Sequence, residues 1–440
     1  MFLLYNLLVS LTAWLWLPWA WMRSRRRAEP VRWAERMGRL RVEPGPERIW
    51  VHAVSVGEVH AAIPLLREIR KRLPGYEILL STTTSSGQQA ARDGARDLYD
   101  HLVYFPMDVA SFCLNAMIRA RPTAVVIMET ELWLNFLWAA DAVGAKVMIA
   151  NGRLSDRSFA RARRFRFFYR YLLRFVNLCL MQSETDCERI VALGADPTRV
   201  KNVGNTKFDQ AMAEQVEGVA AREEFGVPQD APCVVVGSTR SQEEEALVLD
   251  ALLRVKAELP ELYFVLAPRH VERAPEVLDA LSERGLRAAR RSHAEKGADC
   301  LLLDTFGELA KAYACADVAV VGGGFGGFGG QNIFQPLAYG KAVFFGPAMH
   351  NFRDIAELAV RESVGFRVST SEELAAGMLS LLRDPAKLRA IADDAKRLIE
   401  ANQGASERIA SELSHLLTTA RGGIDDTKAA AADDAPNPSC

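Results

Sequence analysis

The chain has 440 residues, which is enough for two or three domains, and its apolar content of 49% is ample for buried cores. Its formal net charge of −1 excludes recognition of nucleic acid through an overall positive field. The seven cysteines are scattered and form no C-x-x-C pair, which is typical of reduced cytosolic thiols rather than of a disulfide framework or a zinc site.

The N-terminal segment predicts a membrane anchor. Residues 1–22 are apolar and rich in tryptophan, and arginines follow at once, at positions 23, 25, 26 and 27. A secretory signal has its positive charge before the apolar run, so this segment is not one. About 20 apolar residues can span a bilayer, with the arginines on the cytoplasmic side. Residues 1–27 are therefore expected to anchor the chain, either across a membrane or, because polar residues interrupt the run, as a helix lying flat at its interface.

Short apolar runs alternate with helical stretches along most of the chain. In the first half, the expected strands are residues 49–54, 78–82, 103–106, 124–128, 146–150, 178–181 and 200–203. A polar linker is expected near 210–230, and the second series of strands is 233–237, 263–267, 300–303, 318–321 and 342–345. This alternation predicts an α/β chain with two Rossmann-like, doubly wound domains, 45–212 and 228–415, which face a cleft. The tail 421–440 lacks core-forming residues and is expected to be disordered.

Acidic residues follow two strands of the first domain, at the strand ends where parallel sheets bind their ligands. Glu58 ends the segment Ser55-Val-Gly-Glu58, which fits a capping box and also fits a general base that accepts a proton from an acceptor hydroxyl. Glu129 and Glu131 are two residues apart, so on an extended backbone they share a face. They are either a functional pair of carboxylates or a helix cap with a salt-bridge partner.

Basic residues also follow strands. Lys207 comes after the strand at 200–203 and is suited either to neutralising a phosphate or to a surface ion pair with Asp209. Arg269, directly after Pro268, is suited to bidentate phosphate binding, with an ordinary exposed arginine as the alternative.

Two glycine-containing segments of the second domain are suited to binding an anion. Thr305-Phe-Gly307-Glu308 starts a helix and fits a capping box, and Gly307 frees backbone N–H groups. Later, seven of the nine residues 322–330 are glycine. So much glycine is entropically costly and removes side chains where another group must come close, which predicts a cradle for a sugar phosphate. Residues 324–329 also fit G-x-G-x-x-G, but the next strand lacks the acid that a dinucleotide site needs.

Residues 153–175 interleave arginine with aromatic residues. At helical spacing one face holds Phe165, Phe168, Leu172 and Phe175. Another face holds Arg163, Arg166, Arg170 and Arg174. This pattern is typical either of a basic amphipathic helix on anionic lipid or of a solvated charged face over a buried aromatic stripe.

Signatures of several other chemistries are absent from the sequence. There is no D-x-D for a metal-bound nucleotide diphosphate, no clustered His and Cys ligand set, no Walker A motif and no G-x-S-x-G. The chemistry is therefore expected to need neither a metal ion nor a cofactor.

Six segments occur in one order along the chain: His52-Ala-Val-Ser-Val-Gly-Glu58, Met128-Glu-Thr-Glu-Leu-Trp133, Ala150-Asn-Gly-Arg-Leu-Ser155, Gly204-Asn-Thr-Lys-Phe-Asp209, Pro268-Arg-His270 and the glycine run to Gln335-Pro336. With the N-terminal anchor, this series resembles the lipid A 3-deoxy-D-manno-octulosonic acid (Kdo) transferases, over residues 1 to about 415. The resemblance implies a GT-B fold and an inverting, metal-independent transfer of Kdo from CMP-Kdo to a lipid A precursor, lipid IVA, in lipopolysaccharide core biosynthesis. It also implies a place on the cytoplasmic face of a bacterial inner membrane, with anionic membrane lipid, and not nucleic acid, as a partner.

The resemblance also implies roles for single residues. Glu58 would be the general base on the acceptor hydroxyl, and Glu129 and Lys207 would stabilise the transition state. The CMP moiety would be held by Pro268, Arg269, Phe306, Gly307, Glu308, Asn332, Ile333, Phe334 and Gln335. Where the family usually has Gly-His-Asn-Pro-Leu-Glu, this chain has Gly330-Gln-Asn-Ile-Phe-Gln335. The Gln335 amide oxygen can still accept a ribose hydrogen bond, but without charge.

Two other functions fit parts of the sequence. One is a membrane GT-B transferase for another sugar nucleotide, such as a lipid-linked N-acetylglucosamine transferase, which a different nucleotide would protect from heat. The other is a membrane-tethered protein that binds a sugar phosphate without turnover, which would bind CMP-Kdo but release no CMP when acceptor is added.

Overall fold

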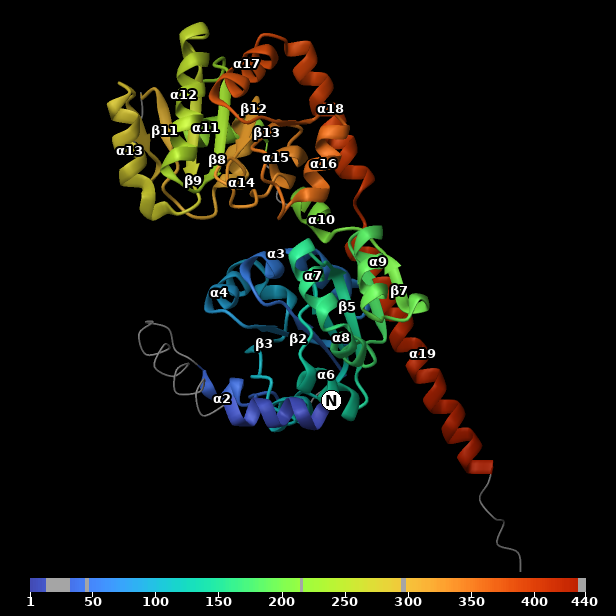
Figure 1. Ribbon diagram of the computed structural model, residues 1–440. Helices are drawn as coiled ribbons and strands as arrows, with labels where there is room; N and C mark the ends of the chain where they lie inside the picture. Colours follow the sequence, from blue (N-terminus) through green and yellow to red (C-terminus); the bar gives the residue numbers. More distant parts are fainter. Residues whose placement is uncertain (13–31, 44–46, 214–216, 294–297, 434–440) are drawn as a thin grey trace, which may run out of the picture. The chain divides into compact units, whose positions relative to one another are not determined.

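The computed structural model describes residues 1–12, 32–43, 47–213, 217–293 and 298–433 (Figure 1). The chain divides into two compact units. The first unit comprises Met1–Gln210 and Gly404–Cys440, and the second comprises Ala211–Gln403.

The first unit is built on a seven-stranded parallel sheet in the order β3-β2-β1-β4-β5-β6-β7. Its strands are β1 (Arg48–His52), β2 (Glu77–Thr82), β3 (His101–Tyr104), β4 (Pro122–Met128), β5 (Lys146–Gly152), β6 (Leu178–Met181) and β7 (Val200–Asn202). Its helices include α2 (Trp33–Arg36), α3 (Val56–Arg72), α4 (Ser85–Gly94), α5 (Ala110–Ala120), α6 (Leu134–Ala142), α7 (Asp156–Arg164), α8 (Arg166–Leu173), α9 (Glu184–Leu193) and α19 (Ala405–Asp433), and α10 (Thr206–Ala213) begins in it.

Successive residues of the central strands enter two separate cores, one on each face of this sheet. Trp50 and Ile127 lie in one core, whereas Ile49, Val51 and Val126 lie in the other. Side chains alternate between the faces of a strand, so both faces of the sheet are buried, as expected when helices cover a parallel sheet on both sides.

Helix α19 comes last in the chain but packs on the first unit. Ile409, Ala410 and Leu413 are fully buried in the core that contains Ile49 and Val51. The predicted second domain, 228–415, therefore extends too far, since residues from Gly404 onward belong to the first unit. Helix α19 continues to Asp433, and residues 434–440 lie outside the described residues, so disorder of the tail stays a prediction.

Residues 2–12 form a helix that is attached to the first unit. The Tyr5 hydroxyl donates a hydrogen bond to Asp108 at 2.7 Å, and the Asn6 amide donates one to Asn135 at 2.9 Å. The same helix exposes a row of leucines, at positions 3, 4, 7, 8 and 11. No helix in the described part of the chain is long and apolar enough to cross a membrane. Residues 13–27 of the predicted anchor lie outside the described residues, and the anchor stays a prediction.

The second unit contains another seven-stranded parallel sheet, in the order β10-β11-β9-β8-β12-β13-β14. Its strands are β8 (Cys233–Thr239), β9 (Tyr263–Pro268), β10 (Ala288–Arg290), β11 (Cys300–Leu302), β12 (Val318–Val321), β13 (Ala342–Phe345) and β14 (Gly365–Arg367). Its helices include α11 (Gly218–Phe225), α12 (Gln242–Glu258), α13 (Ala274–Glu283), α14 (Leu309–Cys315), α15 (Phe334–Ala338), α16 (Arg353–Arg361), α17 (Ser371–Leu382) and α18 (Pro385–Ala401).

The α/β prediction with two parallel sheets is confirmed, and each predicted strand is present within a few residues. The edge strands β10, Ala-Ala-Arg, and β14, Gly-Phe-Arg, were not predicted, because neither contains an apolar run. The expected linker near 210–230 was wrong in part. It contains helix α11, whose Ala221 and Phe225 are buried and give that helix an apolar side.

The predicted amphipathic helix at 153–175 is two helices, α7 and α8. The chain breaks between them at Phe165, the shared cap residue. On the predicted aromatic face Phe165 is 54% exposed, whereas Leu172 is buried. The face is thus neither a wholly buried stripe nor a wholly exposed surface, and its contact with lipid stays a prediction.

Candidate active site

The first unit has a switch of strand order at its middle. From β1 the order runs through β2 to β3 on one side and from β4 to β7 on the other. Ligands of open parallel sheets bind outside the carboxyl ends of the strands at such a point. Glu58 lies in the first turn of α3, after β1, and Glu129 directly follows β4. The two carboxylates are thus brought to the switch point from positions far apart in sequence.

Glu58 is nearly buried, with 9% of its surface exposed. The Val54 N–H donates to its Oε2 at 2.8 Å, and the Ser55 hydroxyl donates to its Oε1 at 3.1 Å. Ser55 is the N-cap residue of α3, but its side chain caps no helix N–H, so the reciprocal bonds of a capping box are not formed. Burial, and then the charge of Glu129, raise the pKa of Glu58 to about 7. A carboxyl with that pKa is suited to general base catalysis near neutral pH.

Glu129 adopts a strained backbone conformation. Its φ is +55°, in the left-handed region, which residues other than glycine rarely adopt. Its N–H still donates to the Ala150 carbonyl at 2.9 Å, so the ladder between β4 and β5 holds it in place. Asn151, in the neighbouring strand β5, also has a φ of +55°. Such conformations cost about 1–3 kcal/mol each and cluster at functional sites, which is consistent with a functional role for this pair of strand ends.

Lys207 lies at the start of α10 and forms an ion pair with Glu129, Nζ to Oε1, at 3.7 Å. Asp209, the partner considered from the sequence, accepts hydrogen bonds from the Gly404 and Ser406 N–H groups, both at 2.7 Å. Asp209 therefore caps the start of α19, and Lys207 is directed to the carboxylate side of the site. Glu129 and Lys207, which the resemblance assigns to transition-state stabilisation, are therefore in contact.

A network of amide side chains supports the start of α10. The Thr206 N–H donates to Asn151 Oδ1 at 3.0 Å, and the Lys207 N–H donates to Asn205 Oδ1 at 3.0 Å. Gln182 joins them, because its amide donates to the Asn151 carbonyl and its oxygen accepts from the Asn205 amide. None of these three amide residues was predicted as a site residue. Their position could have indicated them, since each lies at or after the carboxyl end of a strand.

Glu131 is the third carboxyl of this group. Burial and then the charge of Glu129 raise its pKa, and a hydrogen bond with the Trp133 side chain acts in the opposite direction. Of the two acids after β4, Glu129 forms an ion pair, with Lys207, and Glu131 forms none among the described residues. Because the negative charges of Glu58, Glu129 and Glu131 repel one another, the proximity of these carboxyls favours protonation of at least one of them.

In the second unit the switch of strand order lies between β8 and β12. The glycine-rich run follows β12 directly. A Cβ atom on Gly322 would lie 2.7 Å from the Ser238 carbonyl oxygen, and one on Gly324 would lie 3.0 Å from the Gly346 nitrogen. These glycines are needed so that the run can pack against the ends of the neighbouring strands β8 and β13. The loop therefore lies where a ligand of this sheet would bind.

The predicted CMP-binding residues differ in their surroundings. Arg269, which follows buried Pro268, has an exposed side chain, and its N–H donates to the Thr239 carbonyl at 2.8 Å. Phe306 is 76% exposed, and Gly307 has a φ of +83°, which suits glycine. The Glu308 carboxylate forms an ion pair with the Arg291 guanidinium, Oε1 to Nη2, at 2.6 Å.

The predicted capping box at 305–308 is wrong. Glu308 is itself the N-cap residue of α14, and its side chain makes no cap hydrogen bond. The Thr305 hydroxyl instead donates to the Glu308 carboxylate.

The four residues at the start of α15 are also not equivalent. Asn332 Oδ1 accepts a hydrogen bond from the Phe334 N–H at 2.9 Å. Ile333 and Phe334 are buried, at 0% and 3% exposed, so their side chains belong to the core. Gln335 is partly exposed. A ligand at the start of this helix would contact the side chains of Asn332 and Gln335. It would contact only the backbone of Ile333 and Phe334.

Comparison with known proteins identifies the family. The family model described as 3-deoxy-D-manno-octulosonic-acid transferase (kdotransferase) matches residues 31–210. A 3-deoxy-D-manno-octulosonic acid transferase of Bordetella pertussis is 32% identical over 421 residues, which cover 92% of this chain and 96% of that protein. The chain belongs to the 3-deoxy-D-manno-octulosonic acid transferase family. The transferase is thus a glycosyltransferase, and the family prediction is confirmed.

Two more relatives extend the comparison. A bifunctional glycosyltransferase/methyltransferase of Fusobacterium nucleatum is 33% identical over 335 residues, which cover 74% of the transferase but only 51% of the bifunctional protein. The crystal structure of a UDP-GlcNAc 2-epimerase from Neisseria meningitidis bound to UDP-GlcNAc has a TM-score of 0.60 and 13% identity, over 84% of the transferase and 100% of that chain. This likeness shows a shared fold.

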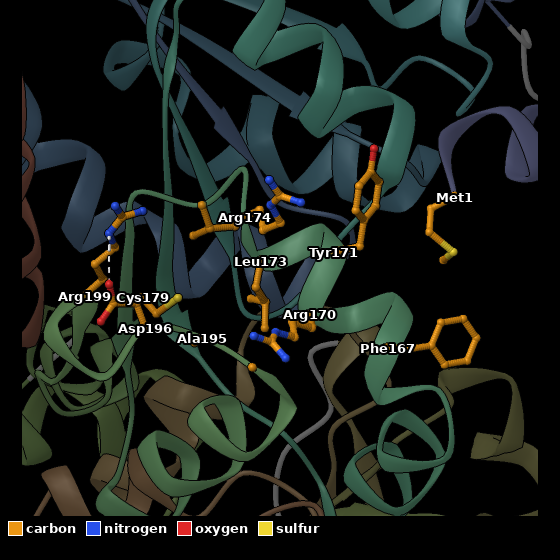
Figure 2. Close-up of a pocket in the computed structure, with 12 residues that line it drawn as sticks. Met1, Phe167, Arg170, Tyr171, Leu173, Arg174, Cys179, Ala195, Asp196 and Arg199 are labelled. Carbon is orange, nitrogen blue, oxygen red and sulfur yellow. Dashed lines mark ion pairs between the residues drawn. The ribbon is translucent and has the colours of Figure 1, made fainter.

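Two basic features of the transferase lie outside the predicted site residues. Arg240, just after β8, lies over the ring of Phe328 in the glycine-rich run, 5.1 Å from its centroid. In the first unit, a cavity of about 640 Å³ is lined by residues of α8 and of the region after α9. Figure 2 shows Arg170 and Arg174 beside it, with Met1 near Phe167 on one side and Arg199 paired with Asp196 on the other. Arg170 and Arg174 belong to the predicted basic face, whereas Arg240 was not singled out in the sequence, because single arginines are common on surfaces.

Proposed function

We propose that this transferase moves Kdo from CMP-Kdo to a lipid A precursor, lipid IVA, in lipopolysaccharide core biosynthesis, with inversion and without a metal ion. The observation that carries the proposal is Glu58, a nearly buried carboxyl with a pKa of about 7 beside the ion pair of Glu129 and Lys207. The names of relatives in Bordetella pertussis and Haemophilus influenzae support Kdo as the sugar. The six ordered sequence motifs support the donor and the acceptor.

The proposed reaction is a single displacement. Glu58 takes the proton of the acceptor hydroxyl, whose oxygen attacks the anomeric carbon of Kdo on the face opposite CMP. The bond to CMP breaks as the new glycosidic bond forms, and CMP leaves as a phosphate monoester anion. This leaving group is already stable, so the site needs charge stabilisation rather than an acid. Lys207 supplies a positive charge, and Glu129 holds it in place through the ion pair.

The second unit binds the CMP moiety in this proposal. Arg269 is suited to the phosphate because its side chain is exposed after β9, next to Pro268. The turn Phe306-Gly307-Glu308 and the start of α15, from Asn332 to Gln335 with Ile333 and Phe334, surround the nucleoside. The donor would thus bind to the second unit and the acceptor to the first, as a GT-B fold implies.

The transferase would act on the cytoplasmic face of a bacterial inner membrane. The leucine row of residues 2–12 gives it an apolar surface. The arginines and aromatic residues around the cavity of α8 suit the phosphate groups and the interface of anionic lipid (Figure 2). These surfaces support anionic membrane lipid as a partner.

The test is CMP release from CMP-Kdo in detergent, with and without a tetra-acylated lipid A precursor. Release that depends on acceptor and falls at least about a hundredfold in Glu58→Gln would establish the transfer and the base. Glu188→Gln, an exposed acid on α9, is the matched control and should leave release unchanged. Equal release from the wild type and Glu58→Gln would make Glu58 a structural residue. No release from either would favour another sugar nucleotide or binding without turnover.

A further inference from the structure

We propose that a pocket under the N-terminal helix binds one acyl chain of the lipid acceptor, an inference that rests on the proposed transfer to a lipid. The pocket has a volume of about 320 Å³ and lies within the first unit. Apolar side chains form most of its lining: Val9, Phe105, Pro106, Met107 and Trp133. At about 30 Å³ for each water molecule, its volume equals that of about ten waters. A methylene group is similar in size to a water molecule, so the pocket has room for a hydrocarbon chain of about ten carbons. An apolar pocket of this kind favours a hydrocarbon over water.

The helix 2–12 forms one wall of this pocket and is fixed in that position. Tyr5, which also lines the pocket, donates its hydroxyl to Asp108 at 2.7 Å. The rings of Phe2 and Trp138 are 4.7 Å apart between centroids, and Asn6 donates to Asn135. The pocket is thus built between elements distant in sequence, and the same helix exposes its leucine row on its other side.

Two lining residues connect the pocket to the proposed catalytic carboxyls. The Thr83 N–H donates to the Val54 carbonyl at 3.3 Å, and the Val54 N–H donates to Glu58 at 2.8 Å. On another side, Trp133 is hydrogen-bonded to Glu131. Because only Val54 separates the pocket wall from Glu58, and Trp133 of the wall reaches Glu131 directly, a chain held here would place its sugar headgroup near these two carboxyls.

Arg36 adds a positive charge to the pocket lining, and this charge complements the oxygen atoms at the polar end of such a lipid. Its Nη2 donates to the Thr83 carbonyl at 2.8 Å, and its guanidinium lies 4.5 Å from the centroid of the Tyr104 ring. Among the described residues that line the pocket, Asp108 is the only acid, and it accepts hydrogen bonds from the Tyr5 hydroxyl and the Phe136 N–H. The Arg36 guanidinium beside an apolar wall complements an acyl chain with an ester, amide or phosphate oxygen near its head.

The first test compares the tetra-acylated acceptor with the same acceptor stripped of its acyl chains, using the full-length protein in detergent. Val9→Trp fills the pocket and should raise KM for the acylated acceptor at least about tenfold, with kcat and the KM for the stripped acceptor unchanged. Ser10→Trp adds the same bulk at the next, exposed position and should change neither value. Equal effects of the two variants, or an equal loss with both acceptors, would overturn the proposal.

A second measurement needs no turnover and no variant. An acylated acceptor with a photoreactive diazirine at the end of a chain is bound to the wild-type protein without donor, irradiated, and mapped by mass spectrometry. Label on Phe105 to Met107 or on Trp133 supports the pocket, whereas label confined to the leucine row of residues 2–12, or to another segment of the chain, overturns it. If the wild type transfers no Kdo to either acceptor, the proposed function fails, and the labelling still decides whether the pocket binds the chain.

Discussion

Three carboxyl groups share a small region at the carboxyl ends of β1 and β4, and this crowding sets the pH range of the reaction. Burial is the first cause of the raised pKa of Glu58, and the charges of Glu129 and Glu131 add to it. The Val54 N–H and the Ser55 hydroxyl stabilise the ionised form and keep the pKa from rising further. The result is a base that is about half ionised at neutral pH.

The first prediction concerns this pKa. A general base acts in its ionised form, so kcat/KM should fall about tenfold for each pH unit below 7 and level off above it. Removing a neighbouring negative charge lowers the pKa of Glu58, so Glu131→Gln should move the acid limb of the pH profile to lower pH, and Glu129→Gln should move it further. Glu188→Gln should leave the limb in place. A limb that stays near pH 7 in both site variants would assign the titration to a different group.

At the scale of elements, the sequence predicted the strands well and the contacts between their ends less well. Glu58, Glu129 and Lys207 were found because each follows a strand, and parallel strands bring such positions to one edge. The left-handed conformation of Glu129 and its ion pair with Lys207 were not predictable, because they depend on the register of β4, β5 and α10. The burial of Ile333 and Phe334 was likewise hidden, since a short helix has too few residues to show a buried face.

The helix of residues 2–12 gives a prediction at this scale. Its bonds to Asp108 and Asn135 hold it against the first unit, which favours a helix at the membrane interface over one that crosses the membrane. Leu4 and Leu8 are 58% and 54% exposed, and burial of a leucine side chain contributes about 1.5–3 kcal/mol. The double change Leu4→Asn and Leu8→Asn should therefore weaken binding to anionic vesicles at least tenfold in a flotation assay, without lowering Tm.

Ser10→Asn is the matched control for this change, because it is exposed on the same helix and removes no apolar side chain. It should leave flotation unchanged. Binding of the double variant equal to that of the wild type would show that residues 2–12 contribute nothing at the interface, and a lowered Tm would mean that the leucines pack against the protein.

At the scale of the whole molecule, the chain leaves its first unit after Gln210 and returns to it at Gly404. The sequence did not predict this return, because the apolar positions of α19 show that the helix is buried but not which sheet it covers. Asp209 fixes the returning chain through the Gly404 and Ser406 N–H groups, two residues after Lys207. The C-terminal helix is thereby linked to the segment that carries the proposed catalytic lysine.

The last prediction follows from this return. Leu413 is fully buried in the core of the first unit, so Leu413→Ala should cost about 2–5 kcal/mol of that unit's stability. In hydrogen exchange of the full chain, protection should fall in β1, β5 and α3 of the first unit and stay unchanged in β8 and β12 of the second, because Leu413 lies in the core of the first unit. His415→Ala, exposed on the same helix, should change neither. Loss of protection in β8 and β12 instead would assign α19 to the second sheet, as the sequence had suggested.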